Sequence, residues 1–162
     1  MKNKTFVLIL GILLLLVNNC AGYKPIFKSN LNFKISDYSI EGEKILGNKI
    51  YSQLYNLSKS SAENSNTRNL AILIKTTKEK KATIKESSGK INEYKITLKT
   101  YVKITDFLSG DKILEQNFTS STNYKSQSQY SDTISLENTS TDILINNIYQ
   151  KLLIKLSENI IL

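Results

Sequence analysis

Residues 91–107, INEYKITLKTYVKITDF, alternate between apolar and polar side chains over almost their whole length. One side of the alternation carries five apolar residues: Tyr94, Ile96, Leu98, Val102 and Ile104. The other side is mostly Lys and Thr. Because side chains on a β-strand point alternately to opposite faces, the pattern predicts an antiparallel strand with one packed face and one face in water. Such a strand folds only within a sheet whose apolar face is covered by other elements.

The segments around this strand supply the elements that could cover it. Residues 32–40 also alternate but shift phase at Asp37, which predicts a strand with a bulge. Apolar residues also recur at helical spacing in two other segments. The first stripe comprises Ile45, Leu46, Ile50, Leu54 and Leu57, and the second comprises Ile134, Ile143, Leu144, Ile148, Leu152 and Leu156. We therefore expect strands over residues 32–40, 70–86, 91–107 and 113–124, and helices over 43–60 and 126–160.

The resulting order, β-α-β-β-β-α, predicts the fold class. Each helix has an apolar stripe to bury, and one face of the sheet is apolar, so both helices belong on that face. Turns at residues 87–90 and 108–112 join the last three strands as neighbours. We therefore expect an α+β two-layer sandwich, with two helices packed on one face of a mostly antiparallel four-stranded sheet.

The N-terminus has the pattern of a targeting segment. Lys2 and Lys4 precede an apolar run over residues 6–17, and Cys20 follows shortly after it. As a helix this run would rise about 18 Å, which is too short for a hydrocarbon core of about 30 Å. The run is therefore typical of a secretory signal peptide rather than of a membrane-spanning helix.

Cys20 is the only cysteine in the chain, and its position resembles the cleavage site of a bacterial lipoprotein signal. In such proteins a peptidase cleaves before the cysteine, which then receives fatty acyl chains. Val17 fits the aliphatic position of that signal, whereas Asn18 and Asn19 depart from its usual small residues. The alternative is ordinary secretion with a free thiol. We expect a lipoprotein signal peptide over residues 1–19, a lipidated tether over 20–31 and a single domain over 32–162.

Composition argues against an enzyme. The chain has no His and one Cys, so it cannot form a Ser-His-Asp or Cys-His arrangement, and it lacks the ligands that zinc prefers. No Gly-rich phosphate loop follows a strand. We expect no catalytic residues, no metal and no cofactor. The formal net charge is +8, which attracts polyanions. Nucleic acid is not the expected partner, because Arg68 is the only arginine and no aromatic or Arg-rich motif is present.

Lys95, Lys99 and Lys103 form a stripe on the polar side of the 91–107 strand. A spacing of four residues puts all three on one face, roughly 13 Å apart. Such a stripe is either a solvated face that hinders aggregation or a surface that contacts anionic groups, such as lipid phosphates. A second basic group on the preceding strand has the same two interpretations: Lys78, Lys80, Lys81 and Lys85.

Two segments resemble the LptE family of lipopolysaccharide-assembly lipoproteins, in its alphaproteobacterial form. The first is CAGYKPIF, residues 20–27, which is similar to the Cys-Gly-aromatic-x-Pro opening of the family, with Ala21 as an extra residue. The second covers residues 94–135, with a strand, a Gly turn, another strand and an aromatic passage entering the last helix. Five residues match that pattern: Asp106, Gly110, Tyr124, Ser128 and Tyr130. Ser131 departs from it, because the family often has Ala there.

This resemblance implies an outer-membrane lipoprotein, anchored on the periplasmic side by acyl chains on Cys20. LptE proteins sit inside the barrel of the translocon protein LptD, where they act as a plug and assembly partner and bind lipopolysaccharide. Lys95, Lys99 and Lys103 are our candidates for contacts with lipopolysaccharide phosphates, chosen from strand geometry.

Two other functions are compatible with the sequence. One is a periplasmic-facing lipoprotein that recruits or inhibits another envelope protein without binding lipopolysaccharide. The other is a secreted basic protein that binds polyanions of the cell wall or nucleic acid. Neither requires an enzyme active site, so the three hypotheses differ only in the binding partner.

Overall fold

The computed structural model describes residues 31–60 and 67–160. The expected signal peptide, Cys20 and all but the last residue of the expected tether lie outside the described residues. The elements follow the expected order: β1 (Phe33–Gly42), α2 (Lys44–Ser60), β2 (Arg68–Lys85), β3 (Ile91–Asp106), β4 (Lys112–Lys125) and α3 (Tyr130–Ile160). None of the helices in these two ranges is both long and apolar enough to cross a membrane.

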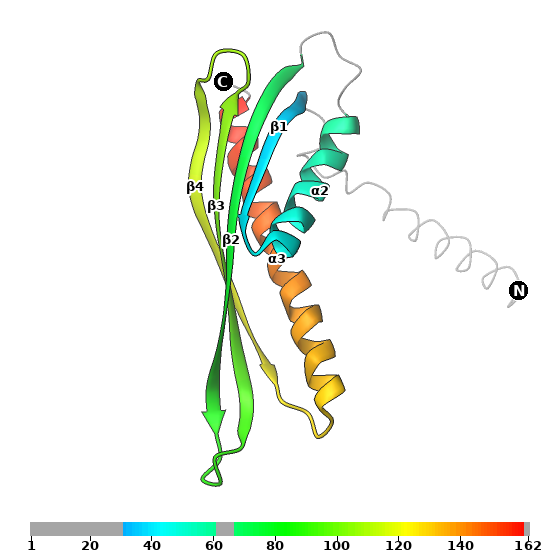
Figure 1. Ribbon diagram of the computed structural model, residues 1–162, viewed down its shortest axis with the longest axis vertical. Coiled ribbons are helices and arrows are strands. Elements are labelled where there is room, and N and C mark those ends of the chain that lie inside the picture. Colours follow the sequence, from blue (N-terminus) through cyan, green and yellow to red (C-terminus); the bar gives the residue numbers. More distant parts are fainter. Residues whose placement is uncertain (1–30, 61–66, 161–162) are drawn as a thin grey trace, which may run out of the picture.

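The four strands form one sheet in the order β1-β2-β3-β4. β1 and β2 are parallel, and the other two neighbouring pairs are antiparallel. Both helices lie on the same side of this sheet (Figure 1). The α+β sandwich expected from the sequence is therefore confirmed. The register of β1 shifts between Ile35 and Asp37, which also confirms the expected bulge.

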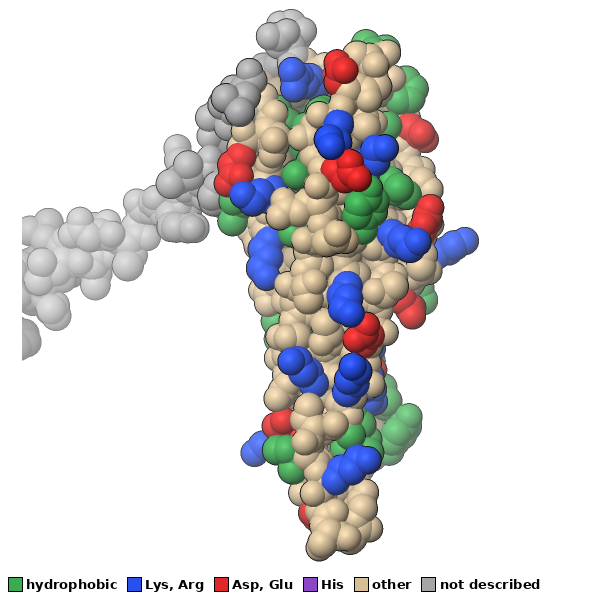
Figure 2. All heavy atoms as spheres, turned by 90° about the vertical axis from the view of Figure 1, so that its left-hand side faces the viewer, with side chains coloured by type: hydrophobic (Ala, Val, Ile, Leu, Met, Phe, Trp, Pro, Cys, Tyr) green, Lys and Arg blue, Asp and Glu red, His purple; other side chains and the backbone are tan. Residues whose placement is uncertain are grey.

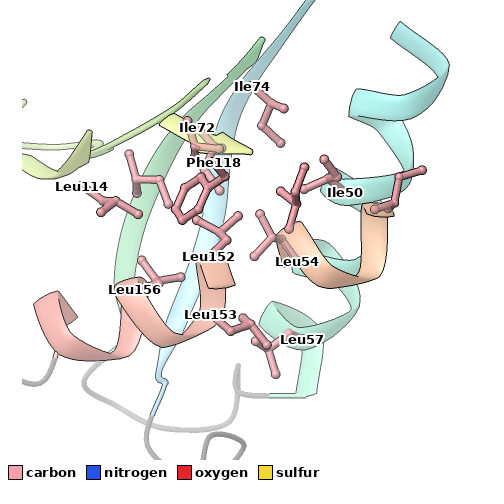
Figure 3. Packing of buried hydrophobic residues seen from close by; sticks show 14 of the residues in the cluster. Ile50, Leu54, Leu57, Ile72, Ile74, Leu114, Phe118, Leu152, Leu153 and Leu156 are labelled. Atoms are coloured by element: carbon pink, nitrogen blue, oxygen red, sulfur yellow. The ribbon is translucent and has the colours of Figure 1, made fainter. Parts of the chain in front are cut away.

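The core lies between the sheet and the two helices. On β3 the side chains at Ile96, Leu98, Val102 and Ile104 are fully buried, as the alternation predicts. Leucine and isoleucine side chains of both helices point toward the sheet strands (Figure 3). Leu31, the last residue of the expected tether, is 1% exposed and therefore belongs to the core.

Two isoleucines counted in the helical stripes lie outside the core. Ile45 is 75% exposed and Ile143 is 52% exposed. Each stands next to a residue of the packed stripe, Leu46 and Leu144, and one residue step turns the side chain by about 100° around the helix axis. The prediction from apolar spacing that these two side chains face the core was therefore wrong.

Gly42 makes the turn from β1 into α2 possible. Its φ is 73°, a left-handed backbone conformation that residues other than glycine rarely adopt. A Cβ atom here would also overlap the backbone carbonyl oxygen of Thr76. The Glu43 amide donates to that same oxygen at 2.8 Å, so the turn is held tightly against β2.

We expect Gly42→Ala to lower the free energy of unfolding by about 2–4 kcal/mol, because backbone strain and the clash with Thr76 add. Gly89→Ala is the matched control, since Gly89 has a φ of 85° but open space where a Cβ would be. Its cost should be about 1–2 kcal/mol, from strain alone. Urea denaturation followed by circular dichroism measures both, and equal losses would show that the contact with Thr76 does not matter.

Candidate functional site

The face of the sheet that points away from the helices carries the predicted lysine stripe. Lys95, Lys99 and Lys103 are exposed on β3, whereas the residues between them on the other face are buried. Figure 2 views the molecule from the left-hand side of Figure 1, where β3 and β4 lie in the upper half and β2 and β3 in the lower half. Lysine and arginine side chains lie along the whole length of this side, with carboxylates between them.

Lys99 is paired within the protein. Its Nζ lies 2.7 Å from Oε1 of Glu79 on β2, and both side chains are about half exposed. The hydrogen bond from Lys99 lowers the pKa of the Glu79 carboxyl from its ordinary value. An anionic ligand at the middle of the stripe would therefore have to share Lys99 with Glu79.

Lys95 has a different environment, because the register places it directly opposite Lys81 of β2. Like charges opposite each other on neighbouring strands destabilise a sheet. An anion bound between the two ammonium groups would relieve this repulsion. Glu79, two residues before Lys81 on β2, also interacts electrostatically with Lys81, so an anion here would compete with that carboxylate.

Lys103 lies beside a shallow hollow at the other end of the stripe. The hollow has a volume of about 260 Å³, and Asp37, Ser39 and Thr105 line it together with Lys103. Glu115 is opposite Lys103 on β4 and accepts a hydrogen bond from the Tyr101 hydroxyl at 2.8 Å. Charges of both signs therefore meet at this end of the stripe, as they do at Lys99 and Lys81, which both interact with Glu79.

The second basic group is divided between the two faces of the sheet. Lys78 and Lys80 lie on the covered side, where both bind Glu137 of α3 at 2.7 Å and 2.6 Å. The Tyr124 hydroxyl donates to the same carboxylate at 2.9 Å. The Nζ of Lys80 also lies 4.3 Å from the ring centroid of Tyr94, which adds a cation–π contact. We call these five residues the Glu137 cluster.

The hydrogen bonds and ion pairs of the Glu137 cluster shift the pKa values of Glu137 and Lys80. Burial by itself would raise the pKa of the Glu137 carboxyl, but hydrogen bonds from Lys78, Lys80 and Tyr124 outweigh it and lower the pKa to about 2. Burial by itself would lower the pKa of Lys80, yet its hydrogen bonds with Glu137 and Tyr124 raise it well above its ordinary value. The cluster is thus charged at neutral pH and joins α3 to the long β2–β3 hairpin.

Sequence reasoning missed this cluster, although a signal for it was present. Lys78 and Lys80 have the same parity in β2 as the buried residues Leu70, Ile72 and Ile74, so the alternation puts them on the covered face. Within the described residues no cluster of His, Cys, Asp and Glu could hold a metal ion. The exposed lysines of the open face are ammonium groups that could bind anions.

Comparison with known proteins shows what the fold is similar to. Neither a protein-family profile nor a curated protein sequence matches the chain. Among solved structures, a protein from Caulobacter crescentus CB15 described as a lipoprotein matches with a TM-score of 0.56 and 11% identity, covering 82% of this chain and 93% of its own. A minor lipoprotein from Acinetobacter baumannii matches with a TM-score of 0.56 and 16% identity, covering 78% and 91%.

Rare lipoprotein B from Shewanella oneidensis matches with a TM-score of 0.52 and 11% identity, covering 75% of this chain and 94% of its own. The three proteins share the fold of this chain over most of their lengths. The chain therefore has a fold that occurs in bacterial lipoproteins.

We expect Glu137→Gln to lower the free energy of unfolding by about 2–3 kcal/mol, because it leaves two partly buried ammonium groups without a counter-charge. Glu115→Gln is the matched control, since it removes an exposed carboxylate that also accepts a tyrosine hydrogen bond. Its cost should be below about 1 kcal/mol. Denaturant titration at pH 7 measures the free energy of unfolding of both variants. Equal losses would contradict the claim that the Glu137 cluster stabilises the fold more than an exposed carboxylate does.

The effect of Glu137→Gln should also depend on pH in a defined direction. The pKa of Glu137 is about 2 in the folded chain, below its ordinary value of 4.5, so the unfolded chain binds this proton more tightly. The stabilisation is therefore complete above pH 4.5 and is lost as the pH falls toward 2. The difference between the wild type and Glu137→Gln should shrink across this window.

Proposed function

We propose that this chain is an outer-membrane lipoprotein of the LptE type, which binds lipopolysaccharide and helps to assemble and plug an LptD-type barrel. The observation that carries the proposal is the fold shared with bacterial lipoproteins, among them rare lipoprotein B from Shewanella oneidensis. The sequence supports it independently, through Cys20 behind its apolar run and the LptE-like segments at residues 20–27 and 94–135. Acyl chains on Cys20 anchor the protein to the membrane on the periplasmic side.

The open sheet face suits the lipopolysaccharide part of this function. Lipopolysaccharide carries phosphates, and Lys81 and Lys95 offer two ammonium groups at directly opposite positions of neighbouring strands. Lys99 and Lys103 continue the positive surface along β3. Each exposed contact contributes about 1 kcal/mol or less, so binding is spread over several lysines. No bond is made or broken in this mechanism.

The length of the domain is sufficient for the proposed role as a plug inside a membrane-spanning barrel. β2 has 18 residues and is therefore about 60 Å long, whereas the hydrocarbon core of a bilayer is about 30 Å thick. A two-layer domain of this length can extend through the lumen of a barrel and beyond it. The Glu137 cluster supports the far half of the β2–β3 hairpin by joining it to α3.

Purification from outer membranes tests the partner. The full chain, tagged after Leu162 and extracted in mild detergent from the cells that make it, should co-purify with a large β-barrel protein. Recovery without any barrel protein would overturn the proposal. Recovery of a different envelope protein in its place would favour the alternative, a periplasmic-facing lipoprotein that recruits or inhibits that protein without binding lipopolysaccharide.

Replacing Lys95, Lys99 and Lys103 together by Ser should weaken lipopolysaccharide binding roughly 5- to 100-fold, which corresponds to about 1 kcal/mol or less for each contact. The control replaces three lysines on the helix side, Lys44, Lys49 and Lys155, and removes the same charge. Fluorescence titration with labelled lipopolysaccharide measures both variants. Equal weakening in the two would mean that net charge, and not the stripe, determines binding.

A further inference from the structure

The turn between β3 and β4 presents two large apolar side chains to water. Phe107 is 50% exposed and Leu108 is 80% exposed. Small and polar residues are the usual choice in tight turns, because they satisfy local hydrogen bonds. Neither of these two side chains belongs to the core, so their apolar surface is available to something outside the domain.

The backbone N–H groups of this turn already have hydrogen-bond acceptors within the protein. The amides of residues 107–110 donate to the Asn69 carbonyl oxygen (2.8 Å), twice to the Asp106 carboxylate (2.9 Å and 3.1 Å) and to the Asp106 carbonyl oxygen (2.9 Å). The turn can therefore leave water without exposing an unpaired N–H group to an apolar medium. This arrangement holds the two side chains outward on a fixed support.

The turn lies at the end of the domain where the chain enters the fold. Phe33, at the start of β1, pairs with Arg68 of β2, and Leu70 of β2 pairs with Asp106 at the end of β3. The entry point and the turn are thus two strands apart, roughly 10 Å across the sheet. The β2–β3 turn lies at the opposite end of the molecule (Figure 1).

The length of chain before the domain limits how far this end can be from a membrane. Residues 20–31 can span at most about 40 Å when fully extended. Acyl chains on Cys20 would therefore keep the entry end within that distance of the bilayer, but they would leave its tilt free. Charges of both signs surround the turn, with Arg68 and Lys112 beside Asp106, Asp111 and Glu115, so the region has no excess of positive charge that would require anionic lipid.

We infer that Phe107 and Leu108 insert into the lipid interface as a second membrane contact, which fixes the end of the domain that faces the bilayer. An acyl anchor supplies membrane affinity, and two apolar side chains on a rigid turn add to it and set the orientation. The inference rests on the lipidation of Cys20 in the proposed function. It does not depend on lipopolysaccharide or on a barrel partner.

A single tryptophan can report this contact, because the chain has none of its own. The full acylated chain carrying Leu108→Trp is reconstituted into phosphatidylcholine vesicles with and without brominated acyl chains. We expect blue-shifted emission and a clear loss of fluorescence with the brominated lipid. Adding Phe107→Ser to this variant should reduce the loss, because part of the inserting apolar surface is removed.

Ile84→Trp is the matched control, since Ile84 is also 50% exposed but lies near the β2–β3 turn. Its fluorescence should not be quenched. Equal quenching in both variants, as for a domain lying flat, would overturn the inference, and so would no quenching in either. Mass spectrometry of the N-terminus distinguishes failure of the proposed lipidation from failure of the membrane contact. An unmodified Cys20 would overturn both the acyl anchor and the inference that rests on it. An acylated Cys20 without quenching of the fluorescence of the Leu108→Trp variant would overturn the inference alone.

Discussion

The burial of one face of β3 is the constraint on which the rest of the structure depends. Ile96, Leu98, Val102 and Ile104 are fully buried, and only elements on the same side of the sheet can cover them. Both helices therefore lie on that side, and the opposite face stays in water (Figure 1). The lysines of β3 are exposed for the same reason that its isoleucines are buried, because strict alternation separates the two sets.

Local periodicity was sufficient to predict the elements, their order and even the bulge at Asp37, because each is encoded within a few consecutive residues. The charged contacts could not be predicted in the same way. Glu137 meets Lys80 across 57 positions of the chain, and Lys99 meets Glu79 only because the β2–β3 register brings them together. Ile45 and Ile143 were misassigned because spacing identifies a stripe but not its exact edges.

The net charge of the chain overstates the positive charge that is available to a ligand on the covered side of the sheet. Lys78 and Lys80 count toward the total of +8, yet Glu137 and two tyrosines hold them between β2 and α3. On the open face, Lys81 and Lys95 stand opposite each other instead. β2 thus directs Lys78 and Lys80 toward α3 for internal pairing and directs Lys81 to the open face, where it adds to the lysines of β3.

The position of α3 has a consequence for how the protein is made. This helix comes last in the chain, and it supplies Leu144, Ile148, Leu152 and Leu156 to cover β3 and β4. Until those residues are available, the strands have no complete cover, so a nascent chain cannot complete this core before α3 has been synthesised. The order of the elements therefore delays the tertiary structure of the sheet until its last covering helix has emerged and can pack against it.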